Sequence, residues 1–411
     1  MGERTNPYKV VTVNCYNRMG STGKIIEDIS TFCKENYTFS RLYEYEETLD
    51  TRPDSYRINN EIQRYFYYIF NRLTGYKYCT GLFPTMKAIR LIKKINPDIV
   101  HLHCPNMGTI HITRLMRFLK KRDIPTVITN HAEFYYTGNC PHAFDCTKYM
   151  TGCGNCDYVF DVNKNYRFDR TAHEWKLMKK AFENWKRVVV VSVSPWQKQR
   201  SSESPIMMGV KQCLVLNGVD EKVFYRRQST ILNSIREKGF EKVILHVTAG
   251  FTNDPNDLKN GRAVIELAKK MPEYAFVVVG PNHVADALPE NVIPYGWVGD
   301  QEQLAKLYSD ADLTLITSKR ETFGMSCAES LCCGTPIVGF CAGGPETVAL
   351  QSYSEFVPFN DIDALAEVMA NWTERILDKN LISQKAIAVY KKERMAHGYK
   401  EIYDEFVHGN S

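Results

Sequence analysis

The chain has 411 residues, of which 44% are hydrophobic and 24% are charged, a balance typical of globular proteins. This length exceeds one ordinary core, so two domains are predicted. No run of eighteen apolar residues occurs and charges lie near the N-terminus, so we expect neither a membrane-spanning helix nor a signal peptide.

Charge is distributed unevenly along the chain. Residues 1–220 carry 32 Lys and Arg against 21 Asp and Glu, a net charge of +11, whereas residues 221–411 carry 20 against 26, a net charge of −6. A basic half suits phosphate-bearing lipid or nucleic acid, and it also suits a merely solvated basic exterior. A basic stripe with regularly placed aromatics is missing outside 61–78, so we expect no nucleic-acid partner.

Apolar runs alternate with helical patterns in both halves. Strands are predicted at 10–16, 98–103, 126–130, 187–193 and 212–216, and a second series follows at 243–247, 275–279, 313–317 and 336–340. Such alternation predicts parallel sheets covered on both faces, hence an α/β fold of two doubly wound halves joined near residue 220. The ligand of such a protein is expected in the crevice where the carboxyl ends of both sheets meet.

The stretch NRMGSTGKI, residues 17–25, follows the first predicted strand and opens a helix. It is not a nucleoside triphosphate loop, because Arg18 and Ile25 occupy positions that need Gly and Ser or Thr. A glycine turn before a helix start nevertheless presents bare amides, so Gly20 and Ser21 are candidate anion-binding residues. An ordinary tight turn opening any strand-helix unit is the alternative.

Residues 61–78, EIQRYFYYIFNRLTGYKY, form a predicted helix with a strongly apolar face. Its period places Ile62, Tyr65, Phe66, Ile69 and Leu73 on one side, with two arginines among the other aromatics. This pattern fits a membrane-interface helix and also an ordinary half-buried helix.

Four of the thirteen cysteines fall within seventeen residues, at Cys140, Cys146, Cys153 and Cys156. The Cys-x-x-Cys end between glycines predicts a structural zinc knuckle. Unligated thiols and disulfides are the alternatives. Disulfides are disfavoured because an odd cysteine count and no export signal indicate reduced thiols in a cytosol. Metal analysis of the purified protein separates the three.

The most specific stretch is residues 318–338, SKRETFGMSCAESLCCGTPIV. It follows a strand and predicts a helix that begins near Phe323 or Gly324. Glu321 precedes that helix and Glu329 lies two turns into it, so the two carboxylates are expected to grip separate hydroxyls along an extended ligand. Between them, the amides of Phe323, Gly324, Met325 and Ser326 point out of the helix start towards an anion.

These motifs resemble the GT-B fold glycosyltransferases, in particular the retaining family 4. In the second half, the elements that carry this resemblance are Glu321, Glu329, Gly334-Thr-Pro336 and Gly343-Gly-Pro-Glu346. The first half resembles transferases of colanic acid and other bacterial exopolysaccharides, and the elements that carry this second resemblance are residues 20–25, 96–103, His131 and 217–220. The resemblance implies two Rossmann-like domains facing a central cleft, and it spans nearly the whole chain.

The resemblance also implies residue roles. Glu321 would hold the hydroxyls of the donor sugar and Glu329 the ribose, while the amides of 323–326 and the Gly20 loop would approach a diphosphate. His131 would lie near the reacting sugar, and Lys259 would neutralise the leaving diphosphate. No divalent metal is expected for catalysis, because Lys259 and the helix start replace it.

Two positions depart from the family pattern. Phe251 stands where an arginine usually accompanies the lysine, and Leu258 lies beside Lys259. His131 is followed by Ala132 and Glu133 rather than by an aspartate. A catalytically weakened scaffold that binds nucleotide sugar is therefore kept as an alternative to the enzyme.

The expected enzyme is a hexosyltransferase of the EC 2.4 class that acts with retention in bacterial surface polysaccharide synthesis. Its donor would be UDP- or GDP-linked, and its acceptor a glycan or polyprenyl-diphosphate-linked hydroxyl at the cytoplasmic face of the membrane. The expected organisation is an acceptor domain at 1–220 with the four-Cys insert at 140–156, a donor domain at 221–390, and a helix at 391–411 packing on the first domain. We expect a cytoplasmic protein with peripheral membrane contact through its basic domain.

Overall fold

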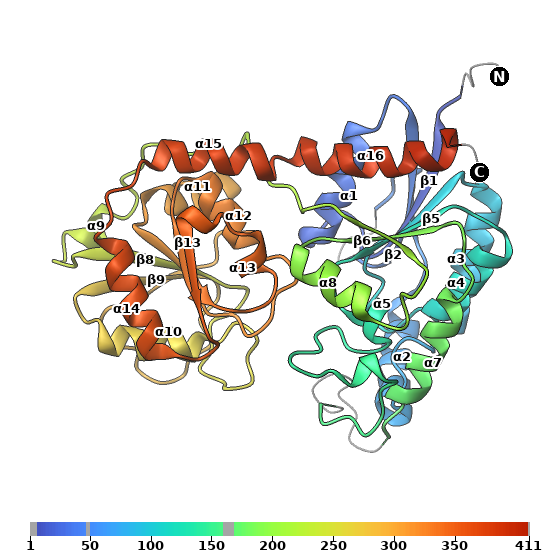
Figure 1. Cartoon of the computed structure of the whole chain (residues 1–411), viewed down its shortest axis with the longest axis horizontal. Helices are drawn as coiled ribbons and strands as arrows, with labels where there is room; N and C mark the ends of the chain where they lie inside the picture. The colour runs from blue at the N-terminus through green and yellow to red at the C-terminus, as the bar shows by residue number, and fades with distance from the viewer. Residues whose placement is uncertain (1–5, 47–49, 159–167, 410–411) are drawn as a thin grey trace. The chain divides into compact units, whose positions relative to one another are not determined.

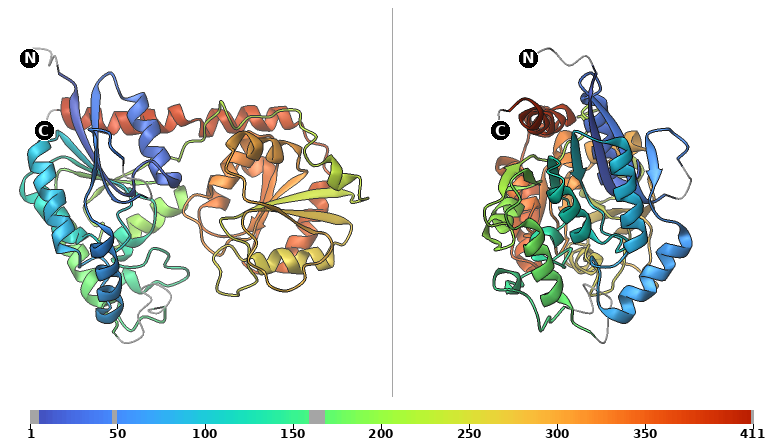
Figure 2. Two further views of the ribbon diagram at one scale, coloured as in Figure 1. Left: turned by 180° about the vertical axis from the view of Figure 1, so that it is seen from behind. Right: turned by 90° about the vertical axis from the view of Figure 1, so that its right-hand side faces the viewer.

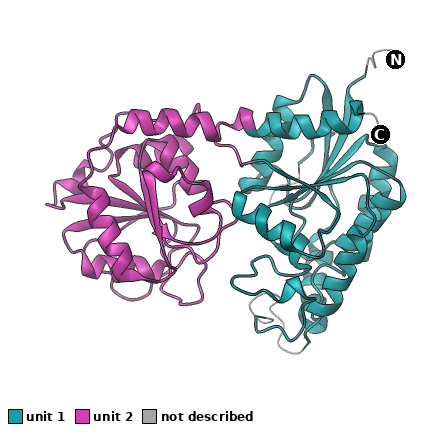
Figure 3. Ribbon diagram, viewed as in Figure 1, with its two compact units in different colours: residues 1–215, 395–411 teal, residues 216–394 magenta. Residues whose placement is uncertain are grey.

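The computed structural model describes residues 6–46, 50–158 and 168–409 and divides the chain into two compact units (Figure 3). Unit 1 comprises residues 1–215 and 395–411, and unit 2 comprises residues 216–394. Each unit is built on a sheet in which every strand pairing among the described residues is parallel. The predicted α/β fold class, two Rossmann-like domains, is confirmed.

The sheet of unit 1 has the strand order β3-β2-β1-β4-β5-β6-β7. Its strands are β1 (Tyr8–Tyr16), β2 (Tyr37–Tyr45), β3 (Ser55–Arg57), β4 (Ile99–Leu102), β5 (Thr126–Asn130), β6 (Val188–Ser192) and β7 (Lys211–Leu214). Its helices are α1 (Gly20–Phe32), α2 (Glu61–Thr74), α3 (Leu82–Ile95), α4 (Ile112–Lys121), α5 (Phe134–Thr137), η1 (Lys148–Met150), α7 (Thr171–Phe182), α8 (Pro195–Glu203) and α16 (Lys392–His408) (Figure 1).

Two apolar clusters cover the two faces of this sheet. One packs α3, α4 and α7 on alternate residues of the strands, such as Val11, Val100 and Val190. The other packs α1 and the C-terminal helix α16 on the intervening residues, such as Val10 and Val189 (Figure 2). Burial on both faces is why these strands read as unbroken runs of valine and isoleucine.

Unit 2 has a six-stranded sheet in the order β10-β9-β8-β11-β12-β13. Its strands are β8 (Lys242–Val247), β9 (Tyr274–Val279), β10 (Val292–Gly296), β11 (Leu313–Ile316), β12 (Ile337–Phe340) and β13 (Ser354–Val357). Its helices are α9 (Asn233–Arg236), α10 (Gly261–Lys270), α11 (Gln301–Asp310), α12 (Met325–Cys332), α13 (Pro345–Val348), η2 (Gln351–Tyr353), α14 (Ile362–Thr373) and α15 (Lys379–Tyr390).

The strand order reverses direction at one place in each sheet. In unit 1 the reversal falls between β1 and β4, and in unit 2 between β8 and β11. The loops that leave the carboxyl ends of two such strands diverge to opposite faces and leave room for a ligand. The loops after β1, β4, β8 and β11 are therefore the expected positions of ligand-binding residues in the two units.

Helix α2 does not have the half-buried face that one interpretation of its sequence predicts. Among its fourteen residues only Tyr67 is buried. The five apolar residues of the predicted face, Ile62, Tyr65, Phe66, Ile69 and Leu73, are all exposed. The half-buried interpretation is wrong because the helix rests on the unit through Tyr67 and its polar residues instead.

The described helices include none that combines the length and the apolar character needed to cross a bilayer.

Candidate functional site

The reversal point of the unit 2 sheet brings together two residues that lie far apart in sequence. Lys259 lies in the loop after β8, just before α10, and Glu321 lies in the loop after β11. The Lys259 Nζ contacts the Glu321 carboxylate, and both side chains keep partial exposure, 34% and 22%. Two backbone contacts align the loops: the Lys319 amide donates to the Leu258 carbonyl at 2.8 Å, and the Thr317 hydroxyl donates to the Lys259 carbonyl at 2.7 Å.

Glu321 is held by its neighbours on both sides. Its side chain also accepts a hydrogen bond from the Ser318 hydroxyl at 3.0 Å. Its backbone forms a bridge with Gly343, because its amide donates to the Ala342 carbonyl and its carbonyl accepts from the Gly344 amide. A carboxylate fixed in this way keeps unused lone pairs that can accept hydroxyl groups of a ligand.

The glycine loop that follows β12 packs against the backbone of Glu321 and is itself held by hydrogen bonds. Glu346 accepts hydrogen bonds from the amides of Ala342 and Gly343, at 3.0 and 2.7 Å. A Cβ on Gly344 would lie 2.5 Å from the Thr322 carbonyl carbon and 2.7 Å from the Phe323 nitrogen. Only glycine therefore allows the loop to approach the chain that leads into α12.

Replacing Gly344 with alanine is expected to lower the free energy of unfolding by about 1–3 kcal/mol, because the new methyl group meets backbone atoms that cannot turn aside. The matched control is Gly299→Ala, where a Cβ meets only the Trp297 ring at 3.4 Å. Urea denaturation of both variants is the measurement. Equal stability of the two variants would contradict the close approach.

Helix α12 begins at Met325, close to the predicted start, and Gly324 is its N-cap with a φ of 83° in the left-handed region. The first amides of a helix have no intrahelical acceptor, so those near Phe323, Met325 and Ser326 are oriented for an anion. Cys327 is buried beneath this helix start. Burial raises the pKa of its thiol, and the nearby Glu321 and Glu346 raise it further, so it stays neutral.

Glu329 lies within α12, whereas Glu321 lies in the loop that precedes this helix. Its carboxylate accepts a hydrogen bond from the buried Tyr308 hydroxyl of α11 at 3.2 Å and keeps partial exposure. The two glutamates are thus held by different partners, which agrees with two separate carboxylates rather than with a close acid-base pair.

Phe251 occupies the place where the resemblance leads one to expect a second cation. Its side chain is fully buried in the core of unit 2, edge-on to His246, and its backbone pairs with residues 281–283. A fully buried position in this core could not hold an unpaired arginine. Residue 251 therefore adds packing to unit 2 and no charge to the site.

In unit 1 the loop after β1 leads directly into α1. Gly20, with a φ of 68°, and Ser21 are exposed at the first turn of this helix. Arg18 contacts Glu27 and lies 3.1 and 3.4 Å from Asp54 and Asp50, so this arginine is committed to carboxylates of its own unit. The exposed amides at the helix start are the part of this loop that suits an anion.

Three histidines of unit 1 form a continuous chain from the end of β5 into the sheet. His131 Nε2 lies 3.1 Å from His103 Nδ1, and the rings of His103 and His101 lie 3.7 Å apart. His101 contacts the Tyr403 hydroxyl of α16 at 2.7 Å and the Thr129 hydroxyl at 2.8 Å. Burial lowers the pKa of His131 to about 4 and those of the other two well below their usual value, so all three rings are neutral at pH 7.

These histidines are expected to make unit 1 less stable in acid. An unfolded histidine binds its proton below about pH 6.5 and the folded ones do not, so the free energy of unfolding falls as the pH drops from 6.5 towards 4. Glu44 and Glu174, whose pKa burial raises to about 7, act in the opposite direction over part of this range.

The contribution of His101 to the pH dependence of stability is therefore measured by comparing the wild type with a variant that lacks this histidine. Between pH 6.5 and pH 4 the unfolding free energy of His101→Gln should fall less steeply than that of the wild type. Urea denaturation at intervals of half a pH unit measures both slopes. Parallel curves over this range would show that His101 contributes no proton linkage.

Glu133, which follows His131, has a structural position. Its side chain is fully buried, lies 3.2 Å from the Arg200 guanidinium, and accepts the Ala143 amide at 3.0 Å and the Tyr136 hydroxyl at 2.9 Å. These contacts anchor the four-Cys segment to the end of β5.

The four cysteines of that segment line one small cavity of about 10 Å³. All four are free thiols, and burial raises the pKa of Cys140, Cys153 and Cys156. Within the described ranges no group of three or more His, Cys, Asp or Glu side chains has the arrangement of a metal site. The predicted zinc knuckle is not supported, because the thiols share a cavity without converging as ligands.

The sequence analysis assigned no role to several supporting residues. Ser318 and Glu346 fix Glu321 and its loop, while Tyr308 holds Glu329 and His103 contacts His131. Two of them left a signal: Glu346 ends the quoted Gly343-Gly-Pro-Glu346 motif, and His103 alternates with His101 in a run that is otherwise apolar.

Comparisons with known proteins give a consistent result. Residues 238–387 match the model described as glycosyl transferases group 1, and residues 46–223 match the model described as glycosyltransferase family 4. Among curated proteins, the N-acetyl-alpha-D-glucosaminyl L-malate synthase of Bacillus anthracis is 24% identical over 46% of this chain, which spans about half, 52%, of that relative. The putative colanic acid biosynthesis glycosyl transferase WcaC of Escherichia coli K12 is 21% identical over 76% of this chain and 78% of its own length.

Solved structures share the fold. Sucrose-phosphate synthase from Thermosynechococcus elongatus superposes with a TM-score of 0.67 at 15% identity, over 98% of this chain and 100% of that one. Anabaena Alr3699/HepE, solved in complex with UDP, gives a TM-score of 0.63 at 13% identity, over 96% and 98%. At these identities the likeness concerns the fold alone.

Proposed function

Because the chain belongs to the GT-B glycosyltransferases of family 4, we propose that it transfers a sugar from a nucleotide diphosphate sugar to an acceptor hydroxyl. The observation that carries this proposal is the meeting of Lys259 and Glu321 beside the start of α12, at the reversal point of the unit 2 sheet. A cation and helix-end amides suit a diphosphate, and a carboxylate suits sugar hydroxyls, so the site has complementary groups for both halves of such a donor.

The proposed reaction proceeds with retention of configuration. The bond between the anomeric carbon and the diphosphate oxygen breaks, and the acceptor oxygen bonds to the same face of that carbon. The acceptor proton passes to the departing diphosphate oxygen, whose charge Lys259 and the α12 amides stabilise. No divalent metal is part of this proposal, because the lysine and the helix start supply the positive potential.

We propose roles for the remaining residues that agree with their positions. Glu329 would hold the ribose, since it lies within α12 and Glu321 precedes this helix. In unit 1, the amides of Gly20 and Ser21 suit an anion, and the neutral His131 suits a contact with the sugar. We assign the acceptor to unit 1 and infer that it is a glycan or a polyprenyl-diphosphate-linked hydroxyl in surface polysaccharide synthesis, as the similarity to WcaC suggests.

A screen of UDP-, GDP- and other nucleotide sugars tests the proposal. Thermal shift should identify one donor that raises the melting temperature, and release of the matching nucleoside diphosphate should follow with that donor. Proton NMR of the product then shows the anomeric configuration. An inverted product would overturn the retaining mechanism, and the absence of binding by any nucleotide sugar would overturn the function.

A second candidate function is a binding scaffold with weakened catalysis. The buried Phe251 favours it, because the site then relies on one cation of its loop where the resembling family uses two. The same screen separates the candidates, since a scaffold would bind a donor and release no nucleoside diphosphate from it.

A further inference from the structure

The apolar face of α2 forms the centre of a larger exposed surface. Ile62, Tyr65 and Leu73 are 80%, 67% and 66% exposed, and Phe83 at the start of α3 is 73% exposed. The two helices are adjacent, since the Phe83 amide nitrogen lies 3.5 Å from the Tyr67 hydroxyl. We call this the α2 surface, and it consists of Ile62, Tyr65, Phe66, Tyr68, Ile69, Phe70, Leu73, Leu82 and Phe83.

This concentration of apolar side chains is unusual for a surface that faces only water. The described residues include twenty exposed large apolar side chains, and nine of these lie between residues 62 and 83. Scattered apolar residues need no explanation, but a contiguous group on a soluble protein marks an interaction surface. The α2 surface therefore has a partner to be identified.

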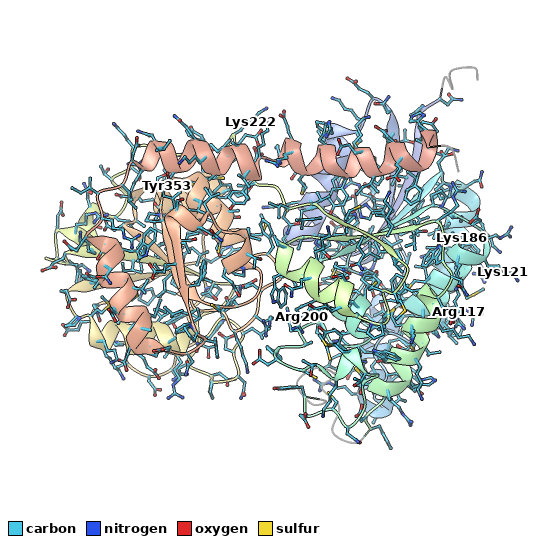
Figure 4. All side chains as sticks on the ribbon, in the orientation of Figure 1. Arg117, Lys121, Lys186, Arg200, Lys222 and Tyr353 are labelled. Atoms are coloured by element: carbon cyan, nitrogen blue, oxygen red, sulfur yellow. The ribbon has the colours of Figure 1, made fainter. Side chains whose placement is uncertain are left out.

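Basic side chains continue from this surface along α3. Phe83, Lys87, Arg90 and Lys94 follow one another at helical spacing on one side, and the three basic residues are exposed. The neighbouring α4 packs beside α3 and also carries four basic and no acidic residues, as α3 does. Figure 4 shows Arg117 and Lys121 of α4 pointing outward from unit 1.

We propose that the α2 surface and the basic side chains of α3 and α4 bind an anionic lipid bilayer. Aromatic and aliphatic side chains can enter the boundary between headgroups and acyl chains, while lysine and arginine meet the lipid phosphates. The tyrosines suit this boundary because each ring is apolar and each hydroxyl is polar.

The mixture of residues favours lipid over other partners. Ile62, Ile69 and Leu73 have no ring to stack on bases and no group for a nucleic-acid phosphate, so such a partner would leave the centre of the surface unused. A protein partner would need both an apolar patch and an acidic patch of matching outline. A bilayer with anionic headgroups supplies both at any point of its surface.

This inference deepens the proposed function by naming the surface that would bring the enzyme to a lipid-linked acceptor. It does not require a donor, because vesicle binding can be measured on the full chain alone. Either the transferase activity or the lipid surface can therefore fail while the other stands.

Flotation with vesicles tests the inference. The full chain should float with phosphatidylcholine vesicles that contain about one third phosphatidylglycerol, and less with phosphatidylcholine alone. The Ile62→Ser/Phe83→Ser variant should lower the partition coefficient on the order of tenfold. The Lys87→Gln/Arg90→Gln/Lys94→Gln variant should lower it on the order of a hundredfold and reduce its dependence on salt.

Matched controls make the same chemical changes elsewhere. Met208→Ser/Ile376→Ser removes two side chains that are 76% and 102% exposed, and Lys238→Gln/Lys269→Gln/Lys306→Gln removes three exposed charges of unit 2. Both controls should float like the wild type, and thermal unfolding shows whether each variant is folded.

Three results would overturn the inference. The wild type could stay unbound with both kinds of vesicle, or the control variants could lose as much binding as the α2 and α3 variants. The third is a dimer in sedimentation velocity, or a complex with DNA, that the α2 variant abolishes while vesicle binding is unchanged.

Discussion

Replacing Lys259 with methionine is expected to lower turnover with the identified donor by roughly two to three orders of magnitude, the usual effect of removing one group that stabilises transition-state charge. Lys259 Nζ lies at the reversal point of the unit 2 sheet, in contact with Glu321. Because Phe251 is buried, no cation at residue 251 compensates for the loss. Release of nucleoside diphosphate under saturating donor measures the effect.

The matched control is Lys269→Met, which removes an exposed lysine from α10 in the same unit. It should retain wild-type turnover. The melting temperature of Lys259→Met should stay close to that of the wild type, because a partly exposed ion pair contributes little to stability. Wild-type turnover in Lys259→Met would remove this lysine from the mechanism.

Replacing Glu321 with glutamine is the second change with a large expected effect. The substitution keeps the shape of the side chain and the backbone bridge to Gly343. It removes the negative charge that faces Lys259, and the same charge would strengthen hydrogen bonds donated by sugar hydroxyls. We expect turnover to fall on the order of a hundredfold, with little change in the free energy of unfolding. Steady-state kinetics and urea denaturation of the same preparation measure both.

Replacing Glu346 with glutamine should have a different effect from replacing Glu321, although the two residues lie in neighbouring segments. The Glu346 carboxylate accepts two backbone amides, so Glu346→Gln should lower the free energy of unfolding by about 1–2 kcal/mol. The two variants should therefore differ: Glu321→Gln should mainly lower turnover, and Glu346→Gln should mainly lower the free energy of unfolding. Identical profiles would mean that Glu321 also acts only as a structural carboxylate.

Much of the fold could be predicted because buried parallel strands have a clear sequence pattern. Strands such as β6 and β9 are unbroken apolar runs, and the predicted positions match them closely. Strand β2 was missed because it carries Arg41 and Glu44, two buried ionisable residues that break the apolar pattern. The edge strands β10 and β13 were missed because they are short and only partly buried, and β10 contains Pro294.

The candidate site could be predicted only as far as its motifs reach. The spacing of Glu321 and Glu329 and the glycine before α12 indicated the helix start, and the structure has that start at Met325. Contacts between distant segments could not be predicted, such as those of Lys259 with Glu321 and of His101 with Tyr403. They depend on strand order, which periodicity does not reveal.

The sequence also could not predict which side of helix α2 faces solvent. Periodicity placed five apolar residues on one face of α2 but could not decide whether that face packs on the unit. The structure leaves it exposed because Asn71 and Tyr67, from the other side of the helix, contact residues 80–83 and 108 instead. Whether an apolar stripe is core or interface is thus decided by tertiary packing.

A structure of the full chain with the identified nucleotide sugar bound would show where the donor lies. We expect the diphosphate within about 3 Å of the amides at the start of α12 and of Lys259 Nζ, with sugar hydroxyls on Glu321. A donor bound away from the reversal point of the unit 2 sheet, with Lys259 and Glu321 still paired and untouched, would contradict it.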